Sequence, residues 1–481
     1  MKRGSGLLVH ITSLKDEFGY GCFSKEAYFF VDFLKKTNQK YWQILPLNPI
    51  DEYGSPYNNS SPYAIEPTLI CLDEFLSREE QKEKGLEDKL TLDEYKDIKM
   101  EILKEIFKKH EKTSKQRAFE KKNKFWLENY AKYMTLEEKL HCKYEYFPKA
   151  YKNKNSTLTK KLIERSTKTI DFYKFLQFVA FSQWEKIKNY ANKNGISIIG
   201  DMPFYPSINS DVVWSEPENF QITDYKLDFV SGVPADYFNT EGQIWNNPVY
   251  NVAKIKSEEF KFLVKKFKHA CGLYDFLRID HFRGYENFFK IPANDLNAKK
   301  GKWEKGFGLQ LFKKLKEEGV RNLIAEDLGQ IDQKVVNLKN KTGLPGMKVY
   351  QFAFDGDSKN LHLPNNFEKN AIAYLGTHDN NTFCGFLETE CESAKDLVLK
   401  NLNLYENSTN EQICYSAIDK LLSSNANVVI LMPQDLLCQD GKGRINKPGT
   451  IKNNWKYKLP RKFYGENIIN YLQHATMLYN R

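Results

Sequence analysis

The chain has 481 residues, of which 41% are hydrophobic and 28% charged, and its formal net charge is +10. This length excludes a single small domain and suits one large barrel with insertions or several ordinary domains. Lys and Glu are interleaved, as in residues 79–84, which indicates solvated helix faces and not a basic surface for nucleic acid.

Short apolar runs that end in polar residues follow one another along the chain, and they are typical of buried parallel strands. Amphipathic stretches between them are predicted as helices, with Ser24 as the candidate N-cap of the first. Alternation of eight strands with helices predicts an α/β fold, the (β/α)8 TIM barrel. The predicted strands are residues 6–10, 41–47, 196–201, 276–280, 322–327, 347–352, 371–379 and 427–431, and the predicted helices are 24–39, 171–194, 309–318 and 411–422.

Two of the connections are too long for plain loops. Residues 71–166 are rich in Lys, Glu and Leu, which predicts an inserted helical subdomain. Residues 204–271 are rich in aromatic residues, which predicts an inserted substrate-binding subdomain. We therefore expect one catalytic barrel over residues 1–481, with both insertions on its C-terminal face.

Acidic residues stand at the C-terminal ends of four predicted strands. Barrel enzymes carry their catalytic groups at these ends, and capping does not readily explain four acids on four different strands. The acids are Asp201, Asp280, Glu326 and Asp379.

Two of these acids suit glycosyl transfer with retention, which needs an ionised and a protonated carboxyl group about 5 Å apart. Asp280 lies beside Arg278, and a nearby cation favours a carboxylate, so Asp280 suits the nucleophile. Glu326 follows the apolar residues 323–325, a setting that raises the pKa of a carboxyl group, so it suits the acid/base. Asp379 is positioned to hold the sugar hydroxyls.

A metal site is the alternative for the same residues, because His281 and His378 adjoin the acids and imidazole with carboxylate suits zinc or iron. Adjacent residues of a strand point to opposite faces, so Asp280 and His281 cannot both point inward unless the strand has ended. The sugar interpretation is favoured, and no metal ligand is assigned.

The sequence motifs of other classes of site do not occur in the chain. There is no Gly-rich phosphate loop between a strand and a helix, and no serine nucleophile elbow. The eight cysteines are scattered without a Cys-x-x-Cys pair, so we expect buried thiols in a reducing compartment. No run of about 18 apolar residues occurs, and a cytoplasmic protein without a transmembrane helix is the expectation.

Nine motifs, taken together and in this order, resemble those of glycoside hydrolase family 77 in the α-amylase clan. This is the family of 4-α-glucanotransferases, amylomaltases and plant disproportionating enzymes. The resemblance runs from residue 7 to residue 450. The motifs are residues 41–47, 53–57, 200–203, 232–238, 242–248, 278–284, 325–329, 376–380 and 444–450.

The resemblance implies roles for individual residues. Asp280 would be the nucleophile, Glu326 the acid/base and Asp379 the transition-state stabiliser. The sugar at the cleavage point would be held by Arg278, His281 and His378. The glucan near the second strand would be contacted by Tyr53, Ser55 and Tyr57. The loop that arches over the cleft would be formed by Asp236, Tyr237, Phe238, Gln243 and Trp245.

The resemblance also implies the partners. They would be α-1,4-glucan donors and acceptors, namely maltooligosaccharides, amylose and glucose, without nucleic acid or membrane. The family needs no cofactor and lacks the calcium common elsewhere in its clan. Departures from its pattern, such as Ala235 and Asn209, leave the three acids in place. A hydrolase of the same clan and a non-catalytic glucan-binding barrel are the alternative functions.

Overall fold

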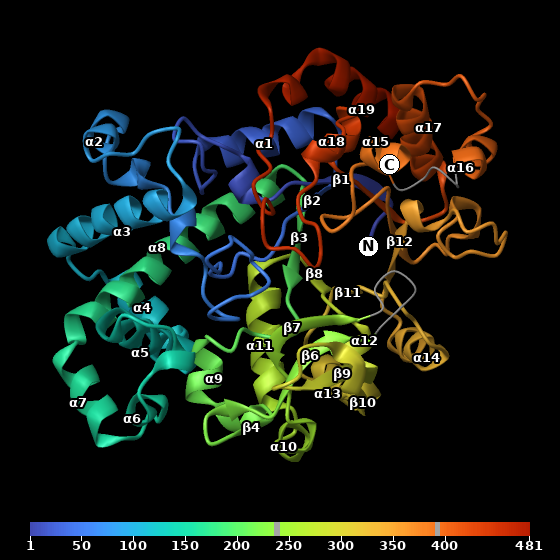
Figure 1. Cartoon of the computed structure of the whole chain (residues 1–481). Helices are drawn as coiled ribbons and strands as arrows, with labels where there is room; N and C mark the ends of the chain where they lie inside the picture. The colour runs from blue at the N-terminus through green and yellow to red at the C-terminus, as the bar shows by residue number, and fades with distance from the viewer. Residues whose placement is uncertain (235–240, 390–394) are drawn as a thin grey trace.

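The computed structural model describes residues 1–234, 241–389 and 395–481. Its centre is an eight-stranded parallel sheet in the order β11-β8-β3-β2-β1-β14-β13-β12 (Figure 1). Each strand corresponds to one predicted apolar run, so the predicted set is confirmed. The strands are β1 (Gly4–Leu8), β2 (Tyr41–Gln43), β3 (Ser197–Met202), β8 (Phe276–Ile279), β11 (Leu323–Ala325), β12 (Gly346–Val349), β13 (Ala371–Tyr374) and β14 (Val428–Leu431).

The two ends of the sheet meet, which makes it a barrel. The backbone N–H of Ala325 in β11 donates to the carbonyl oxygen of Pro345, immediately before β12, at 2.9 Å. The predicted (β/α)8 barrel is therefore confirmed.

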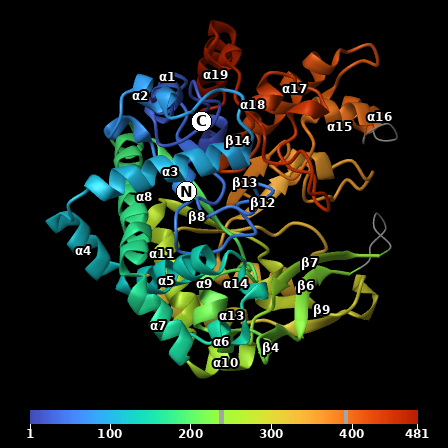
Figure 2. The same ribbon diagram turned by 60° about the vertical axis from the view of Figure 1, so that its left-hand side comes forward.

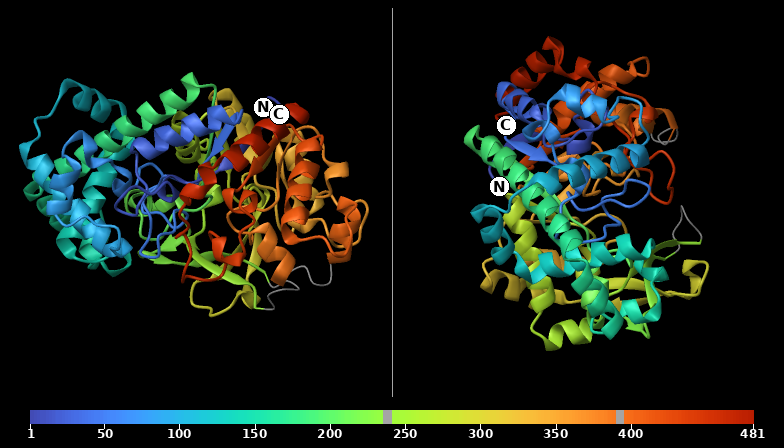
Figure 3. Two further views of the ribbon diagram at one scale, coloured as in Figure 1. Left: turned by 90° about the horizontal axis from the view of Figure 1, so that it is seen from above. Right: turned by 90° about the vertical axis from the view of Figure 1, so that its left-hand side faces the viewer.

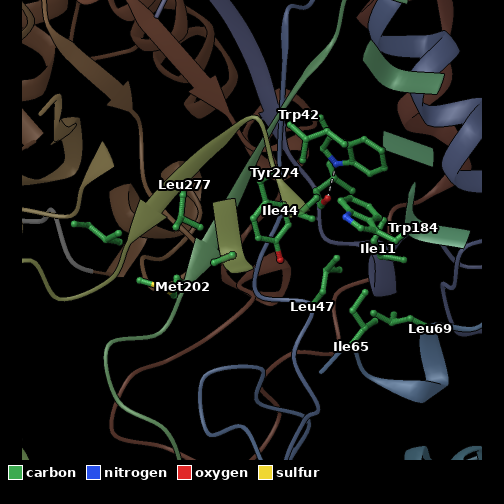
Figure 4. Packing of buried hydrophobic residues seen from close by; sticks show 14 of the residues in the cluster. Ile11, Trp42, Ile44, Leu47, Ile65, Leu69, Trp184, Met202, Tyr274 and Leu277 are labelled. Carbon is green, nitrogen blue, oxygen red and sulfur yellow. Dashed lines mark hydrogen bonds between the residues drawn. The ribbon is translucent and has the colours of Figure 1, made fainter. Parts of the chain in front are cut away.

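Successive residues of the strands belong to two different cores, as the period of a strand requires. Leu8, Ile199 and Ile430 belong to the cluster inside the barrel. Their neighbours in sequence, such as Leu7, belong to the larger cluster between strands and helices. Inside the barrel, the hydroxyl of Tyr374 donates to Oε1 of Gln43 at 2.8 Å. Figure 4 shows part of the outer packing, in which Trp42 of β2 and Trp184 belong to the same hydrophobic cluster.

Helices surround the barrel, and all four predicted helices are present. Ser24 occupies the predicted N-cap of α1, but its hydroxyl donates to Oε2 of Glu26 at 2.8 Å and makes no bond to the helix backbone. The surrounding helices are α1 (Lys25–Lys36), α8 (Thr167–Lys193), α11 (Lys261–Leu273), α13 (Gly308–Glu317), α14 (Gln333–Thr342), α17 (Asn410–Ser423) and α19 (Glu466–Leu478).

The two termini lie side by side (Figure 3). The guanidinium of Arg3 donates to the carbonyl oxygen of Tyr479 at 3.4 Å, which ties the start of β1 to the end of α19. No helix in the described ranges is long and apolar enough to span a membrane.

The Lys- and Glu-rich segment between β2 and β3 folds as helices that gather beside α8 (Figure 2). Capping boxes begin two of them, at Ser77 with Glu80 and at Thr91 with Glu94, so each side chain bonds the other residue's backbone N–H. The helices are α2 (Arg78–Glu83), α3 (Leu92–Lys109), α4 (Ser114–Lys122), α5 (Lys124–Leu140), α6 (Lys149–Lys152) and α7 (Thr157–Arg165).

A second sheet, antiparallel and in the order β10-β9-β6-β7, lies on one side of the barrel (Figure 1). It draws two strands from before β8 and two from after it, and none of the four was predicted as a strand. The strands are β6 (Phe229–Val233), β7 (Gln243–Pro248), β9 (Asn287–Pro292) and β10 (Lys302–Lys305). Short elements complete this part, namely α9 (Asp211–Ser215), β4 (Ile222–Thr223), β5 (Lys226–Leu227), α10 (Val252–Ser257) and α12 (Arg283–Glu286).

Candidate active site

A cleft of about 1750 Å³ opens at the carboxyl ends of the barrel strands. Every predicted site residue that the structure describes lines it. Three further predicted residues, Asp236, Tyr237 and Phe238, lie outside the described residues. The lining includes Tyr53, Ser55, Tyr57, Gln243, Trp245, Arg278, Asp280, His281, Glu326, His378 and Asp379.

Arg278 stands between two carboxylates at the floor of the cleft. Its Nη1 lies 2.7 Å and 2.8 Å from the two carboxylate oxygens of Asp201 and 3.0 Å from Oδ1 of Asp280. Arg278 and Asp280 are two positions apart, so both point inward, and the register pairs Arg278 with Asp201 of β3. The guanidinium therefore offers its charge to Asp280 while the buried Asp201 fixes its position.

Asp201 also contacts Tyr57, another residue that lines the cleft. Its Oδ2 accepts the hydroxyl of Tyr57 at 2.7 Å, and the Tyr57 ring stacks on His378 with centroids 5.2 Å apart. Burial raises the pKa of Asp201, and the charge of Arg278 opposes that shift. Asp201 was recognised as an acid at a strand end, but its contact with Arg278 was missed.

Glu326 is held by the backbone on both carboxyl oxygens. Oε2 accepts the N–H of His281 at 2.7 Å, and Oε1 accepts the N–H of Leu328 at 3.0 Å. Burial raises the pKa of Glu326 to about 8. The charge of Arg278 opposes this shift, and the charge of Asp280 adds a smaller contribution to it. The carboxyl group is therefore largely protonated at neutral pH, as a proton donor requires.

His281 turns away from the line of β8. The strand ends at Ile279, and His281 has a left-handed backbone with φ of 47°. Its ring lies edge-on to Trp245 of β7, with centroids 5.0 Å apart. Burial lowers the pKa of His281 to about 4, so the ring is neutral near pH 7. It can donate or accept a hydrogen bond to a sugar hydroxyl without carrying charge.

Asp379 is oriented by a segment from the far end of the chain. Its Oδ1 accepts Nδ2 of Asn446 at 2.6 Å, and its backbone oxygen accepts Nη2 of Arg444 at 2.7 Å. Nε2 of the buried His378 lies 3.4 Å from Oδ2 of Asp379. Asn446 belongs to the motif of residues 444–450, but its contact with the acid was not predicted.

The alternative of a metal site at this cleft finds no support in the described part of the chain. The donor atoms of His281, His378 and the three acids do not form a group within 4.8 Å of one another. The turn at His281 and the stacking of His378 on Tyr57 direct both rings toward aromatic neighbours.

Comparison with known proteins agrees with this geometry. The family model described as 4-alpha-glucanotransferase matches residues 9–463. The chain belongs to the 4-alpha-glucanotransferase family. Among relatives named 4-alpha-glucanotransferase, that of Clostridium butyricum is 37% identical over 98% of this chain and 100% of its own. That of Aquifex aeolicus is 36% identical over 96% of each chain.

Solved structures of this family have the same fold. The amylomaltase of Streptococcus agalactiae, in complex with acarbose, is 33% identical, with a TM-score of 0.94 and all of both chains covered. The amylomaltase of Corynebacterium glutamicum is 17% identical, with a TM-score of 0.75 over 100% of this chain and 75% of its own, and it shows the fold alone.

Proposed function

We propose that the protein transfers a segment of an α-1,4-glucan to the 4-hydroxyl of an acceptor glucan or of glucose. The reaction is a double displacement with retention, and Asp280, Glu326 and Asp379 carry it. The observation that supports this most is the geometry at the floor of the cleft, where Glu326 accepts the backbone N–H of His281 and the preceding residue, Asp280, accepts a hydrogen bond from Arg278.

In the first step, Glu326 gives its proton to the glycosidic oxygen while a carboxylate oxygen of Asp280 attacks the anomeric carbon. The bond to the leaving chain breaks, and a β-glycosyl ester forms on Asp280. The guanidinium of Arg278 donates to Oδ1 of Asp280 at 3.0 Å and so orients the attacking carboxylate.

In the second step, the acceptor's 4-hydroxyl attacks the same carbon and gives its proton to Glu326. The ester bond to Asp280 breaks, and an α-1,4 bond forms. Asp379 binds ring hydroxyls as the sugar distorts; Asn446 supports this because it fixes Oδ1. His281 and His378 are proposed to hold the sugar at the point of cleavage.

Transfer requires a sugar acceptor to compete with water. Tyr53, Ser55 and Tyr57 on one wall, and Gln243 and Trp245 on the other, line the cleft and could hold the flanking glucose units. Asp236, Tyr237 and Phe238, which lie outside the described residues, are also proposed to contact the glucan. Maltooligosaccharides, amylose and glucose are the proposed donors and acceptors.

Incubation with maltotriose followed by product sizing tests the proposal. A transferase yields glucose together with oligomers longer than the substrate. Glucose and maltose with nothing longer would show a hydrolase instead, and binding of amylose without any product would show a binding barrel. Asp280→Asn is expected to abolish all products while leaving the fold intact.

A cytoplasmic location is also proposed. The cysteines in the described ranges are free thiols, as a reducing compartment favours.

A further inference from the structure

Three cysteines that are far apart in the sequence converge away from the cleft. The sulfur atoms of Cys384, Cys414 and Cys438 all lie within 4.8 Å of one another. None of the three is among the described residues that line the cleft. In residues 1–234, 241–389 and 395–481, no other group of three His, Cys, Asp or Glu side chains brings its donor atoms so close.

The fold brings these thiols together from three elements. Cys384 lies on α15 (Phe383–Thr389), Cys414 lies on α17, and Cys438 follows α18 (Pro433–Leu436). Cys384 and Cys414 are buried, and Cys438 is half-buried, so an ion could reach the group from the side of Cys438.

Asp435 connects the same elements. Its backbone oxygen accepts the Cys414 thiol at 3.2 Å, and its Oδ1 accepts the N–H of Phe383 at 2.7 Å. The side chain is only 1% exposed, and Oδ2 has no hydrogen-bond partner among the described residues. A buried carboxyl oxygen without a hydrogen-bond partner is stabilised either by protonation or by a nearby cation.

The chemistry of the group suits a soft metal ion better than a disulfide. A disulfide uses two sulfurs and would leave the third thiol buried, whereas three sulfurs form most of a tetrahedral set.

We propose that Cys384, Cys414 and Cys438 form a binding site for a thiophilic cation, Zn²⁺, with water in the fourth position. Zinc–sulfur bonds of about 2.3 Å place tetrahedral sulfurs about 3.8 Å apart, so the thiols need to approach by about 1 Å at most. On binding, the thiol protons pass to solvent and three sulfur–metal bonds form.

The ion would brace the two chain segments that meet at Asp379. Cys384 lies five residues after Asp379, and Cys438 lies eight residues before Asn446, whose amide donates to Asp379. The scattered positions of the cysteines in the sequence gave no indication of this site. Its occupancy does not depend on the proposed transfer reaction, because it uses none of the residues assigned to that reaction.

Titration of the reduced, metal-free full-length protein with Co²⁺ tests the proposal. We expect thiolate-to-Co²⁺ charge-transfer absorption and tetrahedral d–d bands that saturate at one Co²⁺ per chain and disappear when Zn²⁺ is added. Absence of these bands in the wild-type protein would overturn the proposal without any variant.

Variants identify the ligands. Cys438→Ser, at the half-buried position, should lose the charge-transfer bands, whereas Cys142→Ser, outside the group, should retain them. Zn²⁺ should raise the Tm of the wild-type protein and of Cys142→Ser, but not that of Cys438→Ser. Circular dichroism before metal addition checks that the variants are folded. Bands that persist in a folded Cys438→Ser variant would contradict the assignment.

Discussion

Glu326 accepts the backbone N–H of His281 at 2.7 Å, so the acid that follows β11 is tied to the residue directly after Asp280, beyond the end of β8. The bond holds the Glu326 side chain against the main chain beside Asp280, so it restricts rotation of the Glu326 carboxyl group. The backbone of His281 is left-handed at this point, with φ of 47°. The proposed proton donor and the proposed nucleophile are therefore held in a fixed position relative to each other.

Activity should fall on the alkaline side. The pKa of Glu326 is raised to about 8, and the proton-donating form exists below that pKa. We expect kcat/KM for maltotriose to decline as the pH rises through about 8, and to do so about tenfold per pH unit once the carboxyl group has ionised. A profile that stays flat to pH 10 would contradict the role of Glu326.

Glu326→Gln should lower kcat for maltotriose by about 10²–10⁴-fold, since it removes the proton donor. An α-maltotriosyl fluoride donor has a leaving group that needs no proton, so the glycosylation step should be largely restored with it. Equal loss with both donors would show that the substitution disturbs the site and not proton transfer.

Asp201→Asn should destabilise the protein as well as reduce turnover. Arg278 is 4% exposed and would lose a buried anionic partner, and removing one member of a buried ion pair costs about 3–5 kcal/mol of unfolding free energy. Glu318→Gln, which removes a surface ion pair with Lys268, should change the free energy of unfolding by less than about 1 kcal/mol. Urea denaturation of both variants measures the difference, and equal effects would contradict the role of Asp201.

Gly284→Ala should displace His281. A Cβ at this position would lie 2.8 Å from Cδ2 of His281 and equally close to the Phe204 ring. We expect a loss of about 1–3 kcal/mol in stability and a rise in KM for maltotriose. Gly272→Ala is the matched control, because no atom lies within 4 Å of its added Cβ in α11. It should be neutral or stabilising.

Asn446→Ala should lower kcat because Asp379 loses the donor that fixes its Oδ1. Asn446→Asp has nearly the same shape but sets a second carboxyl group against Asp379, so we expect a larger loss that deepens as the pH rises. Comparing kcat of the two variants between pH 5 and pH 8 is the measurement. A milder effect for Asn446→Asp than for Asn446→Ala at the higher pH would contradict this role.

The strand ends could be predicted because a charged residue closes a buried apolar run only where the run opens to a polar site. Asp280 and Glu326 stand at such ends, and both line the cleft. The contact between Arg278 and Asp201 could not be predicted in this way, since the residues are 77 positions apart and only strand register joins them.

Other features depend on the same kind of long-range approach. β9 and β10 were missed because their sequences mix aromatic and charged residues, and they become strands only by pairing with each other and with β6. The bond from Asn446 to Asp379 spans 67 positions. The cysteine group likewise joins three elements that no local spacing connects.

Asp280 is proposed to form the covalent link to the transferred glucan. Incubation with a fluorinated glycosyl donor that slows the second step, followed by proteolysis and mass spectrometry, tests it most directly. We predict one glycosyl adduct per chain, carried by Asp280 and absent from Asp280→Asn. An adduct on another residue, or rapid turnover of maltotriose by Asp280→Asn, would contradict the account.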